Sequence, residues 1–225
     1  MKAQGSRALL VPVKNLANAK TRLDSLLSLS ERRELAWVML EGVLAQIAGL
    51  DTTWERVMVT NYDPAIELAR DLGFRVIQEA EQVSESHSVD FASGVLAGEG
   101  LSGVLRIPLD LPLLTQDALA TVLEATAIET PSNEIPVVEQ AGGAPSAILV
   151  PSRDGTGTNA VYRSPPALFP SRFGPDSLSL HRSEARQAGC EPLILSSGAM
   201  GLDIDDPGDI AELVARGIKG PTLDS

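Results

Sequence analysis

The stretch RVMVTNYDPAIELARDLGFRVI, residues 56–77, decides the fold class. Its opening RVMVT is a short apolar run of the kind that forms buried strands, and FRVI at its end is another. Between them, DPAIELARDLG has a proline near its start and a glycine at its end, which is typical of a helix. A strand, a helix and a strand in immediate succession predict two parallel strands joined by a right-handed crossover.

The same alternation continues on both sides of this unit. Upstream, ALLVPV (8–13) predicts a strand, and the segment from Ser30 to Leu50 predicts a helix capped by that serine, with Val38 among its regularly spaced apolar residues. Downstream, the expected strands are 103–108, 135–138, 146–150 and 192–196, and the expected helices lie near 88–98, 115–127, 178–188 and 207–216. This order predicts an α/β fold with a mainly parallel sheet.

Length and composition limit the classes of protein. The chain has 225 residues, 44% of them hydrophobic, and we expect one domain over 1–225 with peripheral tails at 1–7 and 217–225. One cysteine and two histidines exclude an intrachain disulfide and a multi-cysteine zinc site, so any metal should be bound by oxygen. The net charge of −12 argues against electrostatic binding to nucleic acid or an anionic membrane. Without a bilayer-spanning apolar stretch or a signal-peptide pattern, we expect a cytoplasmic protein.

The basic residues are unevenly distributed along this acidic chain. Five of them precede the first acidic residue, Asp24, and these are Lys2, Arg7, Lys14, Lys20 and Arg22. A run of this kind can be an ordinary solvated surface, or it can bind an anionic ligand. Charge alone does not decide between the two interpretations.

Four polar loops follow the apolar runs, at the positions where open α/β sheets bind ligands. They contain the lysines and arginine at 14–22, Asp110 after GVLRIP, the sequence GTGTN (155–159) after SAILVPS, and LDIDD (202–206) near the end. Cations beside free backbone N–H and hydroxyl groups suit a polyphosphate, and aspartates at strand ends suit a hard divalent ion. Together the loops predict phosphate chemistry.

Each of these residues also has a purely structural interpretation. Asp110 could cap the following turn and helix, Asp206 before Pro207 looks like a helix N-cap, and GTGTN could be only a turn. His181 is expected to be a surface or core histidine, and Cys190 an inert small residue. A flavodoxin-like or classical dinucleotide-binding fold is an alternative architecture, although no GxGxxG follows the first strand.

Taken in order, several motifs resemble one enzyme family. They are VPVKNLANAKTRL, SERRELAWVML, PLDLPLL, GTGTNAV, FGPDSLSLH and LDIDDPGDI. The chain resembles the 2-phospho-L-lactate guanylyltransferase family of deazaflavin coenzyme F-420 biosynthesis, which includes phosphoenolpyruvate and 3-phospho-D-glycerate guanylyltransferases. The resemblance implies a single GT-A-like, Rossmann-like nucleotide-diphospho-sugar transferase domain with a mainly parallel mixed sheet. It also implies transfer of GMP from GTP to a phosphorylated three-carbon acid with release of pyrophosphate, and it leaves a homodimer open.

The resemblance also implies roles for individual residues. Lys14, Lys20 and Arg22 would bind the nucleotide, with Lys20 and Asp110 as the catalytic pair. Thr158, Gly174 and Ser177 would bind the small acid, with Thr156 a neighbour. Mg²⁺ is the expected cofactor, and its implied ligands are Asp110, Asp203 and Asp205.

The chain departs from the usual family pattern at several positions. Asn15 stands where proline is common, Asp176 and Gly208 stand where the family often has glycine and glutamate, and Val89–Asp90 replaces a region that commonly contains asparagine. The last departure puts nucleotide contacts near residues 85–94 in question. None removes an implied metal ligand.

Two alternatives to this enzyme are considered. A non-catalytic sensor of nucleotides or phosphometabolites could retain the fold, although three surviving aspartates at the metal positions argue against it. A molybdenum-cofactor-type guanylyltransferase would need a glycine-rich first loop, which KNLANAKTRL is not.

Overall fold

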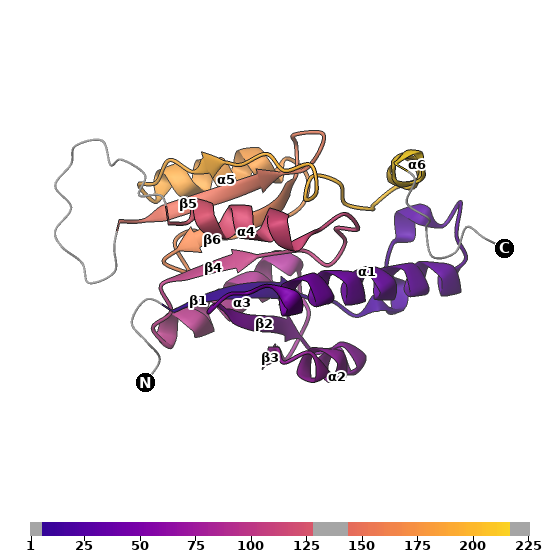
Figure 1. The fold of residues 1–225 in the computed structure, drawn as a ribbon, viewed down its shortest axis with the longest axis horizontal. Helices are drawn as coiled ribbons and strands as arrows, with labels where there is room; N and C mark the ends of the chain where they lie inside the picture. Colours follow the sequence, from indigo (N-terminus) through magenta and orange to yellow (C-terminus); the bar gives the residue numbers. More distant parts are fainter. Residues whose placement is uncertain (1–5, 128–143, 217–225) are drawn as a thin grey trace.

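A seven-stranded sheet forms the centre of the molecule (Figure 1). The computed structural model describes residues 6–127 and 144–216, so the strand expected at 135–138 lies outside the described residues. The strand order is β3-β2-β1-β4-β6-β5-β7, and β6 is antiparallel to both of its neighbours. The strands are β1 (Arg7–Pro12), β2 (Glu55–Thr60), β3 (Arg75–Gln78), β4 (Gly103–Arg106), β5 (Ser146–Pro151), β6 (Thr158–Ser164) and β7 (Leu193–Ile194). The prediction of a mainly parallel α/β sheet is confirmed.

Helices cover both faces of this sheet. On one face, α1 (Leu29–Gly49), α2 (Asp63–Asp71) and α4 (Gln116–Ala125) bury their apolar side chains against β1, β2, β4, β5 and β6. On the other face lie α3 (Glu85–Gly98), packed on β1, β2 and β4, and α5 (Ser177–Gln187), packed on β5 and β6. Each strand of the centre therefore has apolar side chains on both faces, which explains the nearly continuous apolar runs in the sequence.

A separate apolar cluster fixes the C-terminal segment beside the first loop. It joins η2 (Thr21–Leu23), the second of two 3₁₀ turns after β1, to α6 (Pro207–Ala215), which Figure 1 shows near the start of α1. The first turn, η1 (Leu16–Asn18), packs on the main core through Leu16. Leu23 and Ile204 are completely buried in this cluster. As a result, the LDIDD segment lies close to the basic loop, although about 180 residues separate them along the chain.

Two expectations about α1 are wrong in detail. The helix begins at Leu29 and its N-cap is Ser28, whose side chain accepts from the backbone N–H of Glu31 while the Glu31 carboxylate accepts from the Ser28 N–H. This capping box satisfies two backbone N–H donors at once, so the helix is capped by Ser28 and not by Ser30. Val38 belongs to the apolar spacing but is 40% exposed.

Strand β6 was not predicted from the sequence. Its residues TNAVYRS include Thr158, Asn159 and Arg163, and these polar side chains are buried with their own partners. Such a segment lacks the apolar pattern by which a strand is recognised. Because β6 runs against the other strands, its first residues lie at the edge where β4 and β5 end.

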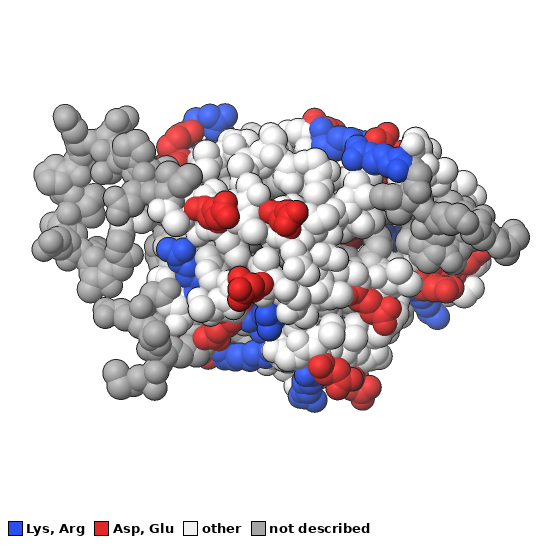
Figure 2. All heavy atoms as spheres, viewed as in Figure 1, with Lys and Arg blue, Asp and Glu red and all other residues white. Residues whose placement is uncertain are grey.

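The polar loops all meet at this one edge of the sheet. The loop after β1, the PLDLP turn after β4, the 152–157 turn after β5 and the segment after β7 leave from strand ends at this edge. Away from it, acidic and basic side chains are both scattered among uncharged residues on the face drawn in Figure 2. Within the described ranges, no helix is long and apolar enough to cross a membrane.

Candidate active site

A cleft with two adjoining pockets opens at this edge. One pocket of about 470 Å³ lies over the turn between β5 and β6, and one of about 380 Å³ lies over the loop after β1. Both volumes are in the range of small-molecule sites. The residues lining both pockets are Arg22, Glu85, Arg106, Pro108, Asp110 and Asp205. Two ligands bound side by side would therefore meet over Asp110.

Lys20 is the centre of the charged part of the cleft. Its Nζ lies 2.7 Å from Asp110 Oδ2 and 3.1 Å from Asp205 Oδ1, and its side chain is only 7% exposed. Burial by itself would lower the pKa of this ammonium, but the two carboxylates outweigh burial and the pKa of Lys20 is raised. The lysine is therefore a fixed positive charge at neutral pH.

The loop that carries Lys20 is held by contacts outside the loop. Gln82 donates from Nε2 to the Val13 carbonyl and accepts from the Asn15 N–H, both at 2.8 Å. Lys20 itself has a φ of 55°, in the left-handed region that a residue with a Cβ rarely adopts. This conformation, before η2, directs the side chain toward the two aspartates.

Asp110 joins two of the loops. Its backbone carbonyl accepts from the Ile204 N–H at 3.3 Å, which places LDID beside PLDLP. Burial would raise the pKa of its carboxyl, but Lys20 and, more weakly, Arg106 reverse this and the pKa is lowered. The capping alternative is wrong, because Thr115 is the N-cap of α4 and accepts from the Ala118 N–H.

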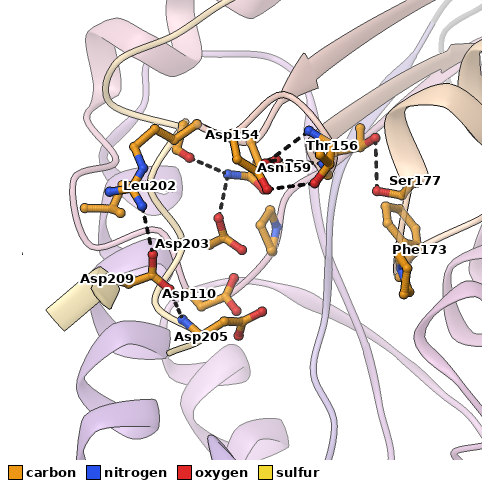
Figure 3. Close-up of a pocket in the computed structure, with 18 of the residues that line it drawn as sticks. Asp110, Asp154, Thr156, Asn159, Phe173, Ser177, Leu202, Asp203, Asp205 and Asp209 are labelled. Atoms are coloured by element: carbon orange, nitrogen blue, oxygen red, sulfur yellow. Dashed lines mark hydrogen bonds and ion pairs between the residues drawn. The ribbon is translucent and has the colours of Figure 1, made fainter. Parts of the chain in front are cut away.

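Asp203 has the opposite electrostatic environment. Burial, followed by the charges of Asp110 and Asp205, raises the pKa of its carboxyl. Figure 3 shows the three carboxylates grouped on one side of the pocket. Asn159 Nδ2 donates to Asp203 Oδ1 at 3.2 Å and to the Met200 carbonyl at 2.8 Å, and so fixes the position of Asp203. The sequence offered only one signal for this role of Asn159, its place at the end of GTGTN.

The remaining aspartates of LDIDD differ in role. Asp205 contacts Lys20 and also lies 3.7 Å from Arg22 Nη1. Asp206 accepts from the Gly208 and Asp209 N–H groups at the start of α6, which confirms it as an N-cap with proline at N1. Asp209 in turn accepts from the Asp205 N–H and holds that residue in place.

The other side of the pocket is lined by neutral groups. Ser177 Oγ and Thr158 Oγ1 are 3.3 Å apart, and both residues are buried. Gly174 has a φ of 126°, a conformation that requires glycine, in the turn that leads to Ser177. Asp176, where the family often has glycine, has a φ of 55° and is one of the few residue types that tolerate it. Thr158, Gly174 and Ser177 therefore line the same pocket, and Figure 3 shows Ser177 on the side opposite Asp110, Asp203 and Asp205.

The expectation of freely available N–H groups in GTGTN is wrong for three of its residues. The Gly155 N–H donates to the Ser152 carbonyl, and the Gly157 N–H donates to the Ser152 Oγ. The Thr156 N–H donates to the Asp154 carboxylate. The Thr156 hydroxyl also donates to Asp154, at 2.7 Å. The turn therefore satisfies these three N–H groups internally, and it lines the pocket with Thr156, Gly157, Thr158 and Asn159.

Arg106 is a site residue that sequence analysis missed. It is buried beneath both pockets, forms an ion pair with Glu85, and donates to the Asn159 carbonyl at 3.1 Å. The ring of Phe173 lies 4.0 Å from its guanidinium carbon. The available signal was an arginine inside the otherwise apolar run GVLRIP.

The family departure near residue 90 also has a structural explanation. Val89 is buried in the core, and Asp90 accepts from the N–H and hydroxyl of Ser171 and from Arg163. These contacts hold the segment that leads to Gly174. Glu85, at the start of the same helix, lines both pockets.

The basic opening segment is not one unit. Arg22 lines both pockets of the cleft, whereas Lys14 and Lys20 line only the pocket over the first loop. Arg7 is at the opposite end of β1, where it donates to Thr126 and lies over the Trp54 ring. Arg7 is also the first residue of β1, so the strand begins within the expected tail, and Lys2 lies outside the described residues.

Comparison with known proteins identifies the family. The sequence profile described as "Guanylyl transferase CofC like" matches residues 7–222. The chain belongs to this family. It is therefore a nucleotidyltransferase of the guanylyltransferase class, and the resemblance seen in its motifs is confirmed.

A phosphoenolpyruvate guanylyltransferase of Rubrobacter xylanophilus is 32% identical over 92% of this chain and 93% of its own length. A 2-phospho-L-lactate guanylyltransferase of Methanothermobacter thermautotrophicus is 27% identical over 92% and 84%.

Solved structures agree on the fold. A candidate nucleotide-diphospho-sugar transferase from Desulfovibrio desulfuricans G20 superposes with a TM-score of 0.70 at 15% identity, covering 97% of this chain and 90% of that one. A cytidylyltransferase from Leptospira borgpetersenii gives a TM-score of 0.60 at 12% identity, with coverages of 93% and 85%. The expected GT-A-like fold of this guanylyltransferase is confirmed.

Proposed function

We propose that this guanylyltransferase transfers GMP from GTP to a phosphorylated three-carbon acid and releases pyrophosphate, as a step of deazaflavin coenzyme F-420 biosynthesis. The acid is 2-phospho-L-lactate, phosphoenolpyruvate or 3-phospho-D-glycerate. The observation that carries the proposal is the Lys20–Asp110–Asp205 group, placed where the pocket over the first loop adjoins the pocket over the β5–β6 turn, one side of which is lined by hydroxyl groups.

The reaction needs no protein base. A phosphate oxygen of the acid attacks the α-phosphorus of GTP, the new oxygen–phosphorus bond forms, and the bond to the β-phosphate oxygen breaks with its electrons leaving on pyrophosphate. The attacking oxygen is already anionic at neutral pH, so no proton has to be removed. Catalysis then depends on alignment and on offsetting negative charge. A cleft whose central groups are a lysine and carboxylates suits this chemistry.

Lys20 would act on the nucleotide phosphates from a fixed position. Its ammonium is kept charged by two carboxylates and is held in place by them before substrate arrives. Triphosphate oxygens entering the pocket over the first loop would compete with the carboxylates for its three N–H donors. Arg22 and Lys14, both at the surface of that pocket, would add attraction for the distal phosphates.

The aspartates fit a hard divalent cation. All three offer oxygen ligands, and the pKa of Asp203 is raised first by burial and then by the charges of Asp110 and Asp205, a repulsion that a cation would relieve. Among the described residues, no three His, Cys, Asp or Glu side chains are arranged to hold a metal ion by themselves. Mg²⁺ is usually bound by only one or two carboxylates, and substrate phosphates would supply further oxygen ligands. Mg²⁺ bound to Asp110, Asp203 and Asp205 would offset charge developing on the phosphate oxygens.

The acceptor would bind on the hydroxyl-lined side of the pocket over the β5–β6 turn. Thr158 and Ser177 supply hydroxyls, and the glycine at 174 lets the backbone approach a ligand closely. Neutral donors can hydrogen-bond a carboxylate or phosphate of the acid without a positive charge that would also attract the triphosphate of the nucleotide. This side of the cleft therefore suits the smaller anion.

Pyrophosphate release tests the proposal. Purified enzyme with Mg²⁺ should release pyrophosphate from GTP in the presence of at least one of the three acids, and more slowly with ATP, CTP or UTP. Comparing kcat/KM across the acids identifies the preferred one. No release with any acid would refute the proposal, and GTP binding in calorimetry without turnover would instead favour a sensor.

A further inference from the structure

His181 lies beneath the hydroxyl-lined side of the pocket, where it contacts Thr158, and it is completely buried. It belongs to α5, one turn beyond Ser177, and is surrounded by the rings of Phe169 and Phe173, with Phe173 edge-on at 4.9 Å. It makes two hydrogen bonds. Nε2 is 2.8 Å from the Arg172 backbone nitrogen, and Nδ1 is 3.1 Å from Thr158 Oγ1.

These two partners determine the tautomer of the ring. A backbone N–H can only donate, so Nε2 must accept and carries no hydrogen. A neutral imidazole then has its hydrogen on Nδ1, which donates to Thr158. Burial first, and then the charges of Arg106 and Arg163, lower the pKa of His181 to about 3, so the ring is neutral under physiological conditions.

The tautomer has a consequence for Thr158. Its oxygen accepts from His181 Nδ1 and also from Ser177 Oγ, at 3.3 Å. A hydroxyl oxygen has two lone pairs, and these two contacts occupy both. The Thr158 hydroxyl hydrogen is then left to donate elsewhere, and Thr158 lines the pocket.

We propose that His181 is a positioning residue that makes Thr158 a dedicated hydrogen-bond donor to an anionic oxygen of the acceptor. The proposal rests on the acceptor site described under the proposed function. His181 does not touch the substrate and transfers no proton. It fixes the polarity of the hydroxyl pair so that the pocket presents a donor to a carboxylate or phosphate oxygen.

Two substitutions at position 181 separate this role from a structural one. In His181→Asn the amide nitrogen takes roughly the place of Nδ1, so the donor to Thr158 is kept and the contact with Arg172 is lost. In His181→Gln the amide oxygen can reach the Arg172 N–H, and the donor to Thr158 is lost. We expect His181→Gln to lower kcat/KM for the acid about tenfold, the size of one hydrogen bond to a charged group, and His181→Asn to lower it less. The KM for GTP should change less than about twofold in both.

A double-mutant cycle tests whether Thr158 is the intermediary. In a Thr158→Val background, His181→Gln should have almost no further effect on kcat/KM for the acid, because the hydroxyl is already gone. A loss in His181→Asn equal to or larger than that in His181→Gln would overturn the proposal, as would an undiminished effect in the Thr158→Val background. His87→Gln, which replaces the exposed histidine of α3, is the matched control.

The tautomer can also be measured in the wild-type protein. Because the chain has two histidines, imidazole nitrogen NMR of wild type and His87→Gln assigns the signal of His181 directly. The expected result is a neutral ring with hydrogen on Nδ1, and hydrogen on Nε2 would overturn the proposal even if the substituted proteins did not fold. Wild-type enzyme without turnover would refute the acceptor chemistry, whereas the wrong tautomer in an active enzyme would refute only the role of His181.

Discussion

The side chains on the two sides of the cleft are held in place by different kinds of contact. On the charged side, Lys20, Asp110 and Asp205 bind one another. On the neutral side, His181 contacts Thr158 from behind the pocket, and Thr158 in turn contacts Ser177. The charged groups must exchange partners when substrate or metal binds, whereas the neutral hydroxyls can keep their supporting contacts.

This difference follows from the cost of burial. A buried ammonium without a partner would be strongly unfavourable, so Lys20 requires its carboxylates in the free protein. A hydroxyl needs only one or two hydrogen bonds, which neighbouring side chains supply. Substitutions on the charged side should therefore change both the turnover and the pKa values of the remaining charged groups. Substitutions on the neutral side should change only kcat/KM for the acceptor acid.

The largest effect is expected from Asp110→Asn. The change preserves shape but removes one negative charge from both the Lys20 pair and the implied metal site. We expect kcat/KM to fall by about 10²–10³, the scale of losing one electrostatic contact in the transition state. Pyrophosphate release at several Mg²⁺ concentrations measures it, with Asp71→Asn at the exposed end of α2 as control. Near-normal turnover at low Mg²⁺ would show that the charged side is structural.

The second effect tests the neutral side. Ser177→Ala removes one hydroxyl from the pocket, and we expect kcat/KM for the acid to fall about tenfold with the KM for GTP nearly unchanged. Ser179→Ala, on the exposed side of the same helix, should match the wild type. Equal losses for GTP and acid would mean that the two sides do not bind different substrates.

The third effect concerns stability on the charged side. Burial and two neighbouring carboxylates raise the pKa of Asp203. The protonated carboxyl therefore stabilises the folded protein at acidic pH, and this stabilisation is lost as the pH rises through the folded-state pKa. Asp203→Asn should therefore raise the free energy of unfolding at neutral pH without metal, by on the order of 1 kcal/mol. Denaturant unfolding at neutral pH and near the ordinary pKa of 3.8 measures the gain, which should disappear at the lower pH.

The effect of Mg²⁺ on stability tests the same role of Asp203. Binding to the folded state should raise the melting temperature of wild type, and less so in Asp203→Asn, because one ligand has lost its charge. Equal shifts in the two proteins would exclude Asp203 from the metal site. A less stable Asp203→Asn protein at neutral pH would contradict the electrostatic account of this residue.

The smallest effect is expected at the rim of the charged side. The Arg22 side chain is 73% exposed and 3.7 Å from Asp205, so its attraction for phosphate is screened by water. We expect Arg22→Ala to raise the KM for GTP by only about two- to threefold, and the difference should fade as salt increases. Arg70→Ala on the exposed side of α2 is the control. An effect that persists in high salt would indicate a direct, desolvated contact.

The alternation of apolar runs was sufficient to predict most of the fold. Runs such as RVMVT and FRVI are buried on both faces, and a continuous apolar strand can be recognised without its neighbours. The cap at Ser28 was missed although Ser28 and Glu31 form a local capping box that the sequence contains, because Ser30 was expected instead. Strand β6 was missed for another reason: its polar residues are buried through contacts that prevail over local pattern. Thr158 and Asn159 are polar, and only their partners across the fold make them strand residues.

By itself, the sequence determined which chemical groups are present and at which ends of the strands they stand: Lys20 after the first strand, Asp110 after the fourth, and the hydroxyls near GTGTN and FGPDS. Only the tertiary structure decided which of them meet. The antiparallel direction of β6 brings Asn159 to Asp203, packing of Leu23 with Ile204 brings Asp205 to Lys20, and burial of His181 fixes the polarity of Thr158. Local sequence sets the identity and spacing of groups, but pairing across 185 residues, as between Lys20 and Asp205, depends on the packing of the whole core.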